Sequence, residues 1–208
     1  MKNKRMIVDI GMSVVLFLLM SYQITGELLH EWFGIIMTIL VIIHQILNRK
    51  WYSTLFKGKY NPYRIISNSI NILLLISFAL TAFCGMSMSN HAVPFLYGMA
   101  PISFVRRMHL SMPYYSFALM GIHLGLHLPA IISRFKLGSK TKNIINIILC
   151  LLACIGLYLY IKNGVHNYML FKAAFAFFDY SKSALLVFIE NILMMILFVF
   201  IGSCLAKK

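Results

Sequence analysis

The sequence has little charge, and almost none of that charge is negative. Only 12% of its 208 residues are charged, and 5 acidic residues stand against 19 Lys and Arg residues. Soluble domains carry about 25% charged residues. Apolar residues make up 61% of the chain. These proportions exclude an ordinary soluble globular protein and indicate an integral membrane protein that contacts lipid.

Apolar runs, by contrast, are long and numerous. A helix needs roughly 20 apolar residues to cross a hydrocarbon layer of about 30 Å. Open sheets cannot satisfy their backbone in lipid, and these runs are much longer than barrel strands, so helices are expected. The sequence therefore predicts an all-α integral membrane protein with six transmembrane helices. The predicted spans are about 7–25, 28–48, 65–88, 104–130, 143–162 and 183–205.

Several common motifs are missing. The chain has no Gly-rich phosphate loop, no nucleophile elbow and no zinc-finger spacing. Its four cysteines form no CxxC pair, so we interpret them as small apolar packing residues. No small-x-small cleavage site follows the first apolar run, which is therefore expected to be a retained span.

The positive charge lies in alternate loops. With the N-terminus inside, the predicted inside segments hold 14 of the 19 Lys and Arg residues, Lys207 and Lys208 among them. The other five lie outside: Arg106, Arg107, Lys162, Lys172 and Lys182. A surface for nucleic acid would not alternate in this way, so no nucleic-acid partner is expected. The asymmetry follows the positive-inside rule and predicts that both termini are cytoplasmic.

Two predicted spans carry histidines at the same spacing. His30 and His44 are 14 residues apart, and so are His109 and His123. Fourteen helical residues rise about 21 Å and end about 40° short of four full turns, so each pair lies on one face. Both helices follow outside loops and run in the same direction. His30 and His109 are thus expected at the outer depth, and His44 and His123 at the inner depth. Unrelated interfacial histidines are the alternative, but a repeated spacing makes coincidence a poor explanation.

Two imidazoles that face each other suit one kind of bound group well. They are good axial ligands for a flat metal macrocycle, and ionisable groups inside membrane helices usually have a function. Haem iron held by nitrogen on both faces has no open position, which suits electron transfer. Without a CxxCH motif, the haem would be a non-covalent, b-type haem. We therefore predict two haem b groups, an outer iron held by His30 and His109 and an inner iron held by His44 and His123.

This pattern resembles the four-helix core of cytochrome b from the quinol–cytochrome c oxidoreductases. There, the same spacing on the second and fourth helices ligates a high and a low haem. The stretch "RRMHLSMP" is similar too, with Arg shortly before His109 and Pro113 four residues after it. The stretches "SYQITGELLHEWFG" and "WYSTLFKGKYNP" resemble a family of small bacterial cytochrome-b-like membrane proteins. That family often accompanies flavin-binding extracytoplasmic redox domains.

The resemblance covers about residues 7–132 and implies a domain organisation and a function. Residues 1–134 would form the four-helix haem bundle, and 135–208 two further transmembrane helices with an outer interfacial segment. The protein would lie in the bacterial cytoplasmic membrane. It would move electrons between a quinone pool or cytoplasmic donor and an extracytoplasmic acceptor, for example a flavoprotein. The chain lacks the Pro-Glu-Trp-Tyr quinol-oxidation motif, so a bifurcating quinol oxidase is not implied.

Two other functions stay open. One is a haem-free membrane protein, a transporter or assembly factor, that binds a transition metal through its histidines. The other keeps the haem but makes the protein the membrane anchor subunit of a soluble oxidoreductase.

Basic side chains near the histidines are candidates for cofactor binding. Arg106 and Arg107 could neutralise haem propionates, or they could be an interfacial pair. His127, one turn past His123, could bond a propionate or a quinone, or lie in the interface without a ligand. Gly34, one turn after His30, and Gly121 and Gly125, which flank His123, could leave room for a porphyrin edge or serve helix packing.

The few carboxylates have open roles as well. Glu190 is the only carboxylate well inside a predicted span, where it could carry a proton to a quinone or make a structural pair. Glu27 and Glu31 flank His30. They could tune the site or dock a cationic partner, or simply lower the positive charge of the outer loop.

Overall fold

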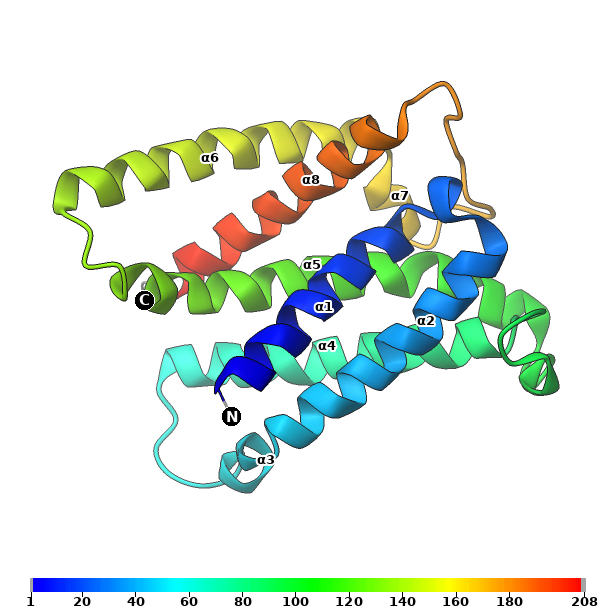
Figure 1. Cartoon of the computed structure of the whole chain (residues 1–208), viewed down its shortest axis with the longest axis horizontal. Helices are drawn as coiled ribbons and strands as arrows, with labels where there is room; N and C mark the ends of the chain where they lie inside the picture. Colours follow the sequence, from blue (N-terminus) through cyan, green and yellow to red (C-terminus); the bar gives the residue numbers. More distant parts are fainter. Residues whose placement is uncertain (1, 207–208) are drawn as a thin grey trace. The chain divides into compact units, whose positions relative to one another are not determined.

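The computed structural model describes residues 2–206, with side chains from Lys4 to Ala206, and these residues form helices and no strand. The side chain of Lys2 and all of Lys207 and Lys208 lie outside this range. Figure 1 shows the order of the elements along the chain. The long helices are α1 (Lys2–Met20), α2 (Tyr22–Leu47), α4 (Pro62–Met86), α5 (Ile102–Ser133), α6 (Ser139–Lys162) and α8 (Ala184–Leu205). The short elements are α3 (Lys50–Thr54), the 3₁₀ helix η1 (Pro94–Leu96) and α7 (Val165–Met169).

Five of the described helices are long and apolar enough to cross a membrane: α2, α4, α5, α6 and α8. The chain is therefore a multi-pass α-helical membrane protein. Helix α1 is not among the five, and its 19 residues include the charged Lys2, Lys4, Arg5 and Asp9. A sixth span in this part of the chain stays a prediction, and so does the cytochrome-b-like bundle.

Helix α2 is interrupted near its start by Gly26. This residue has φ 66° and ψ 178°, a conformation that only glycine adopts easily. No atom lies within 4 Å of the position that a Cβ would take, so the backbone conformation alone requires glycine. The regular part of α2 therefore begins at Glu27, and His30 lies in its first turn.

The chain forms two compact units, which interleave along the sequence. Unit 1 comprises Met1–Lys59, Ala79–His109 and Phe177–Phe188, and unit 2 comprises Tyr60–Phe78, Leu110–Ala176 and Ile189–Lys208. Unit 1 thus contains α1, α2 and the start of α5 up to His109. Unit 2 contains His123 and His127. The predicted division of the chain at residue 134 stays a prediction.

Glycines allow very close helix packing in unit 2. A Cβ added at Gly125 would lie 2.2 Å from the Val199 carbonyl oxygen, and one at Gly121 would lie 2.5 Å from Phe198 Cβ. Both glycines of α5 therefore face α8, as small residues do where membrane helices approach closely. His123, midway between them, points to the other side of α5. Of the two roles considered for these glycines, the structure supports helix packing.

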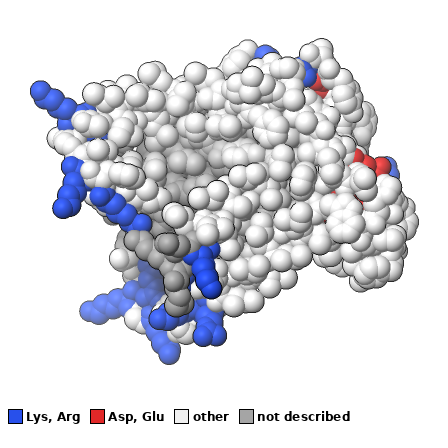
Figure 2. Space-filling view, in the orientation of Figure 1, with Lys and Arg blue, Asp and Glu red and all other residues white. Residues whose placement is uncertain are grey.

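Unit 1 has one basic and one acidic end. In Figure 2, which draws the whole chain, Lys and Arg side chains gather at the end where α3 lies, and the visible carboxylates lie at the other end beside a few Lys or Arg side chains. We call the end with Arg49 and Lys50 the basic end, and the end with Glu27 and Glu31 the acidic end. At the basic end, Arg5 Nη2 donates a 2.8 Å hydrogen bond to the Leu47 carbonyl, one of the carbonyls that the end of α2 leaves unpaired.

Candidate metal centre

At the acidic end of unit 1, the imidazoles of His30 and His109 face each other. Their ring centres are 6.0 Å apart and their planes are perpendicular, at 90°. A metal bound by one nitrogen of each ring, at the roughly 2 Å of an imidazole–metal bond, would put the ring centres about 6 Å apart. The observed separation is therefore compatible with one metal ion that a nitrogen of each ring would bind.

The imidazole of His109 is held in place from α4. Its Nδ1 donates a 3.1 Å hydrogen bond to the Thr81 carbonyl, which leaves the lone pair of the ring on Nε2. Metal-ligating histidines usually donate their other N–H to a carbonyl or carboxylate in this way. A Cβ added at Gly85 would lie 2.9 Å from His109 Cε1, so this glycine provides the space that the ring occupies.

The imidazole of His30 lies among aromatic side chains. The Tyr22 ring meets it edge-on at 5.0 Å and stacks on Phe178 at 5.2 Å. The Leu19 backbone lies near the imidazole. The Nδ1 of His30 is buried among these groups.

At the basic end of unit 1, His44 has a carboxylate partner. Its Nδ1 lies 2.8 Å from Asp9 Oδ1, so α1 supplies the acceptor that orients this ring. Asn48 Nδ2 donates to the His44 carbonyl at 2.9 Å and lies 3.4 Å from Nε2 of the ring. A carboxylate partner makes an imidazole a more basic ligand.

In unit 2, His123 has an amide partner. Its Nδ1 donates a 2.8 Å hydrogen bond to Asn71 Oδ1 of α4. The ring of His127 meets that of His123 edge-on, with the ring centres 4.9 Å apart. His44 and His123 belong to different units, and their predicted pairing stays a prediction. The quinone or propionate role of His127 also stays a prediction.

Arg106 and Arg107 lie in the first turns of α5, just before His109, and both are exposed. Their predicted contact with haem propionates stays a prediction.

The sequence analysis did not identify Asp9 and Asn71 as the side chains that orient His44 and His123. A carboxylate and an amide inside predicted spans were nevertheless available signals. The Thr81 carbonyl carries no such signal.

Glu190 makes the structural pair that was one of its two predicted roles. Its side chain is only 7% exposed, and its Oε2 accepts a 2.9 Å hydrogen bond from Asn163 Nδ2 at the end of α6. This bond joins α6 to α8 within unit 2.

Comparison of the chain with known proteins finds no matching family model, no similar curated protein and no similar solved structure. By its fold, the chain belongs to the class of multi-pass helical membrane proteins.

Proposed function

We propose that this protein is a membrane-bound electron-transfer protein that holds b-type haem. The single observation that carries the proposal is the pair formed by His30 and His109, with ring centres 6.0 Å apart. Bound haem would supply one-electron redox chemistry, and six-coordinate iron would favour electron transfer over oxygen chemistry.

The hydrogen bonds of the histidines support this assignment. Three of the four proposed ligands direct Nδ1 to an acceptor: His109 to Thr81, His44 to Asp9 and His123 to Asn71. Nε2 would then be the nitrogen that binds iron, and in His44 this requires Asn48 Nδ2, which lies 3.4 Å from it, to move away. These acceptors fix the rotation of each ring, which reduces the conformational freedom that a ligand loses on binding.

A haem-free metal site fits the same histidines less well. Structural zinc sites have four protein ligands, and catalytic sites have three. Within residues 4–206, no Cys, Asp, Glu or third His joins His30 and His109 in a group of three potential ligands. Two imidazoles alone suit a metal whose other ligands come from a macrocycle. This difference favours haem over a transporter or assembly factor that binds a bare ion.

The remaining parts of the proposal concern the path of the electrons. His30 and His44 lie on one helix, about 21 Å apart along its axis. A second haem held by His44 and His123 would therefore extend the path across the membrane. We place the basic end in the bacterial cytoplasm, with α1 as a sixth span, following the positive-inside rule. The donor would be a quinone or a cytoplasmic protein, and the acceptor an extracytoplasmic protein such as a flavoprotein.

The first experiment is the reduced-minus-oxidised visible spectrum of the purified protein, with the haem extracted and counted per chain. We expect a b-type spectrum and two haems per chain. One haem per chain would restrict the proposal to a single histidine pair. No haem after expression with an ample haem supply would refute the proposal and favour the haem-free metal-binding function.

A further inference from the structure

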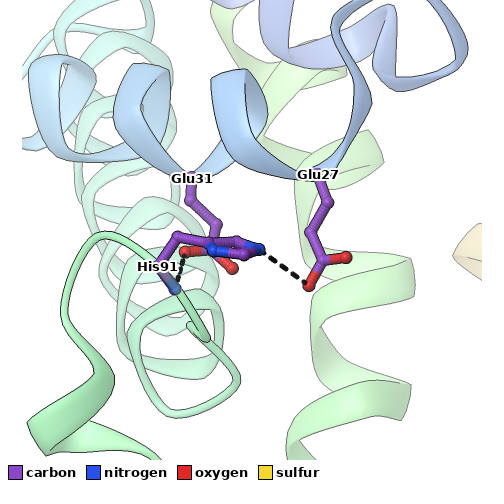
Figure 3. A group of neighbouring side chains, drawn as sticks. All are labelled: Glu27, Glu31 and His91. Carbon is purple, nitrogen blue, oxygen red and sulfur yellow. Dashed lines mark hydrogen bonds and ion pairs between the residues drawn. The ribbon is translucent and has the colours of Figure 1, made fainter.

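A carboxylate at the acidic end joins α2 to the segment that follows α4. Glu31 is the residue directly after His30, and its side chain points from α2 toward the segment that carries His91 (Figure 3). The carboxylate accepts four hydrogen bonds, which come from Ser89 Oγ (2.7 Å), Asn90 N (2.9 Å), His91 N (2.8 Å) and Ala92 N (2.8 Å). We call Glu31 and residues 89–92 the Glu31 clasp.

The clasp fixes the shape of the segment it holds. Successive backbone N–H groups that point to one side form a concavity for an anion, and hydrogen bonds to a charged acceptor are the stronger ones. Ser89 is 3% exposed, and its Oγ also accepts a 3.0 Å hydrogen bond from Val93 N. Gly98 N donates to the Ser87 carbonyl at 3.0 Å, which closes the segment. Residues 87–98 are therefore a folded connection and not a loose loop.

This connection leads directly into α5 and to His109, and all of it lies in unit 1. The clasp thus ties the helix of His30 to the connection that precedes the helix of His109. We propose that Glu31 is a positioning residue, which sets the mutual orientation of the His30 and His109 rings. This inference rests on the proposed haem site.

A bound cation is the other use that this cluster suggests. Glu27, Glu31 and His91 bring potential ligand atoms within 4.8 Å of one another. However, both oxygens of Glu31 already accept hydrogen bonds, and the side chains of His91 and Glu27 are 46% and 52% exposed. His91 Nε2 and Glu27 Oε1 are 3.9 Å apart, the separation of a weak surface pair. The contacts therefore favour a clasp that is complete without a cation.

The test compares Glu31→Gln with Glu27→Gln in the full-length protein. Glu31→Gln places an amide NH₂ among four donors, so at least one hydrogen bond is lost. Glu27→Gln removes the same charge one turn away, where the carboxylate accepts one hydrogen bond, from Asn90 Nδ2. The main measurement is the EPR spectrum of the ferric protein, because its anisotropy depends on the angle between the axial imidazole planes. A second measurement, on haem-free protein, is the hydrogen exchange of the amides of residues 90–92.

We expect Glu31→Gln to shift the EPR signal of one haem and to leave the other unchanged. It should also speed amide exchange in residues 90–92 by tenfold or more, whereas Glu27→Gln should change neither result. Glu31→Asp, which keeps the charge, should give an EPR signal between those of Glu31→Gln and the wild type. A general loss of stability would instead lower the occupancy of both haems together, and this result would overturn the proposal.

Two further results would count against the clasp. If the wild-type protein binds two haems and Glu31→Gln leaves both signals unchanged, the positioning role fails while the proposed function stands. If a chelator applied to the wild-type protein reproduces the shift, the cluster is a cation site instead. A wild-type protein without haem would refute the proposed function itself, and exchange at residues 90–92 would still report on the clasp.

Discussion

The two ends of α2 present the same residue in two different settings. At the acidic end, His30 faces His109, and the acceptor for His109 is the neutral carbonyl of Thr81. At the basic end, His44 is bonded to the carboxylate of Asp9. The two proposed haem sites thus differ in the acceptor that a ligand's Nδ1 has, which is a carbonyl for His109 and a carboxylate for His44.

This difference has a consequence for redox chemistry. A carboxylate on Nδ1 increases the electron donation of the imidazole, which stabilises ferric over ferrous iron and lowers the reduction potential. A neutral carbonyl does so less. We therefore expect the haem held by His44 to have the lower potential. Electrons would then move from the basic end to the acidic end, which is from the cytoplasm outward in the proposed orientation.

The largest expected effect is the loss of a whole haem. His30→Ala and His109→Ala should each reduce the haem content from about two to about one per chain, because bis-histidine coordination needs both ligands. The two variants should lose the same spectral component, and His44→Ala and His123→Ala should lose the other. Haem counting and low-temperature difference spectra measure this. His166→Ala in α7 is the control and should keep both haems.

If His30→Ala and His109→Ala lost different spectral components, the comparison of the two ends would fail. It would mean that the two rings serve different haems in spite of their 6.0 Å separation.

A smaller effect is expected from crowding the acidic end alone. Gly85→Ala would place a Cβ 2.9 Å from His109 Cε1, so the ring must shift. Overpacking of this kind costs about 1–3 kcal/mol, which corresponds to a loss of haem affinity at this site of roughly 5- to 150-fold. Gly138→Ala, just before α6, is the matched control, because no atom lies within 4 Å of its added Cβ.

Titration of haem into haem-free protein measures both glycine variants. An unchanged affinity in Gly85→Ala would show that His109 does not hold its ring in this position when haem is bound.

The sequence predicted the elements better than it predicted the neighbours of the histidines. Five of the six predicted spans coincide with helices long and apolar enough to cross a membrane, because apolar runs of this length have few alternatives in lipid. These helices begin and end within about six residues of the predicted bounds. The spacing of 14 residues predicted that His30 and His109 lie at one depth, and their ring centres are 6.0 Å apart; their role as metal ligands stays a prediction. Helical periodicity is regular, so the face of a residue on its own helix follows from its number.

The partners of these rings depend on the rotation of neighbouring helices, which close packing determines. The contact of Gly85 with His109 is one example, and no periodic pattern marks it. The Thr81 carbonyl is a backbone group that every residue has, so nothing in the sequence distinguishes it. Similarly, Glu31 was expected to tune the site, to dock a cationic partner or to lower the positive charge of the outer loop, and its bonding partners were not predicted. Its actual acceptor role depends on three backbone N–H groups whose direction only the folded segment defines.

The smallest predicted effect tests the charge difference between the two ends. Asp9→Asn keeps a hydrogen-bond acceptor for His44 but removes the negative charge. Hydrogen bonds to charged groups exceed neutral ones by about 1 kcal/mol, and the Asp9 side chain is 50% exposed, which weakens its field. We therefore expect the potential of one haem to rise by roughly 20–40 mV, given about 59 mV per tenfold change for one electron. The potential of the other haem should stay constant in a redox titration.

Asp179→Asn is the matched control, because it removes a carboxylate of unit 1 that accepts hydrogen bonds from Ser181, far along the chain from the proposed ligands. An equal shift in both variants would mean that net charge, not the bond to His44, sets the potential. If only Asp9→Asn shifts a reduction potential, but the shifted potential belongs to the haem of His30 and His109, the assignment of the two ends would be reversed. Either result would remove the physical reason for electron flow from the basic end to the acidic end.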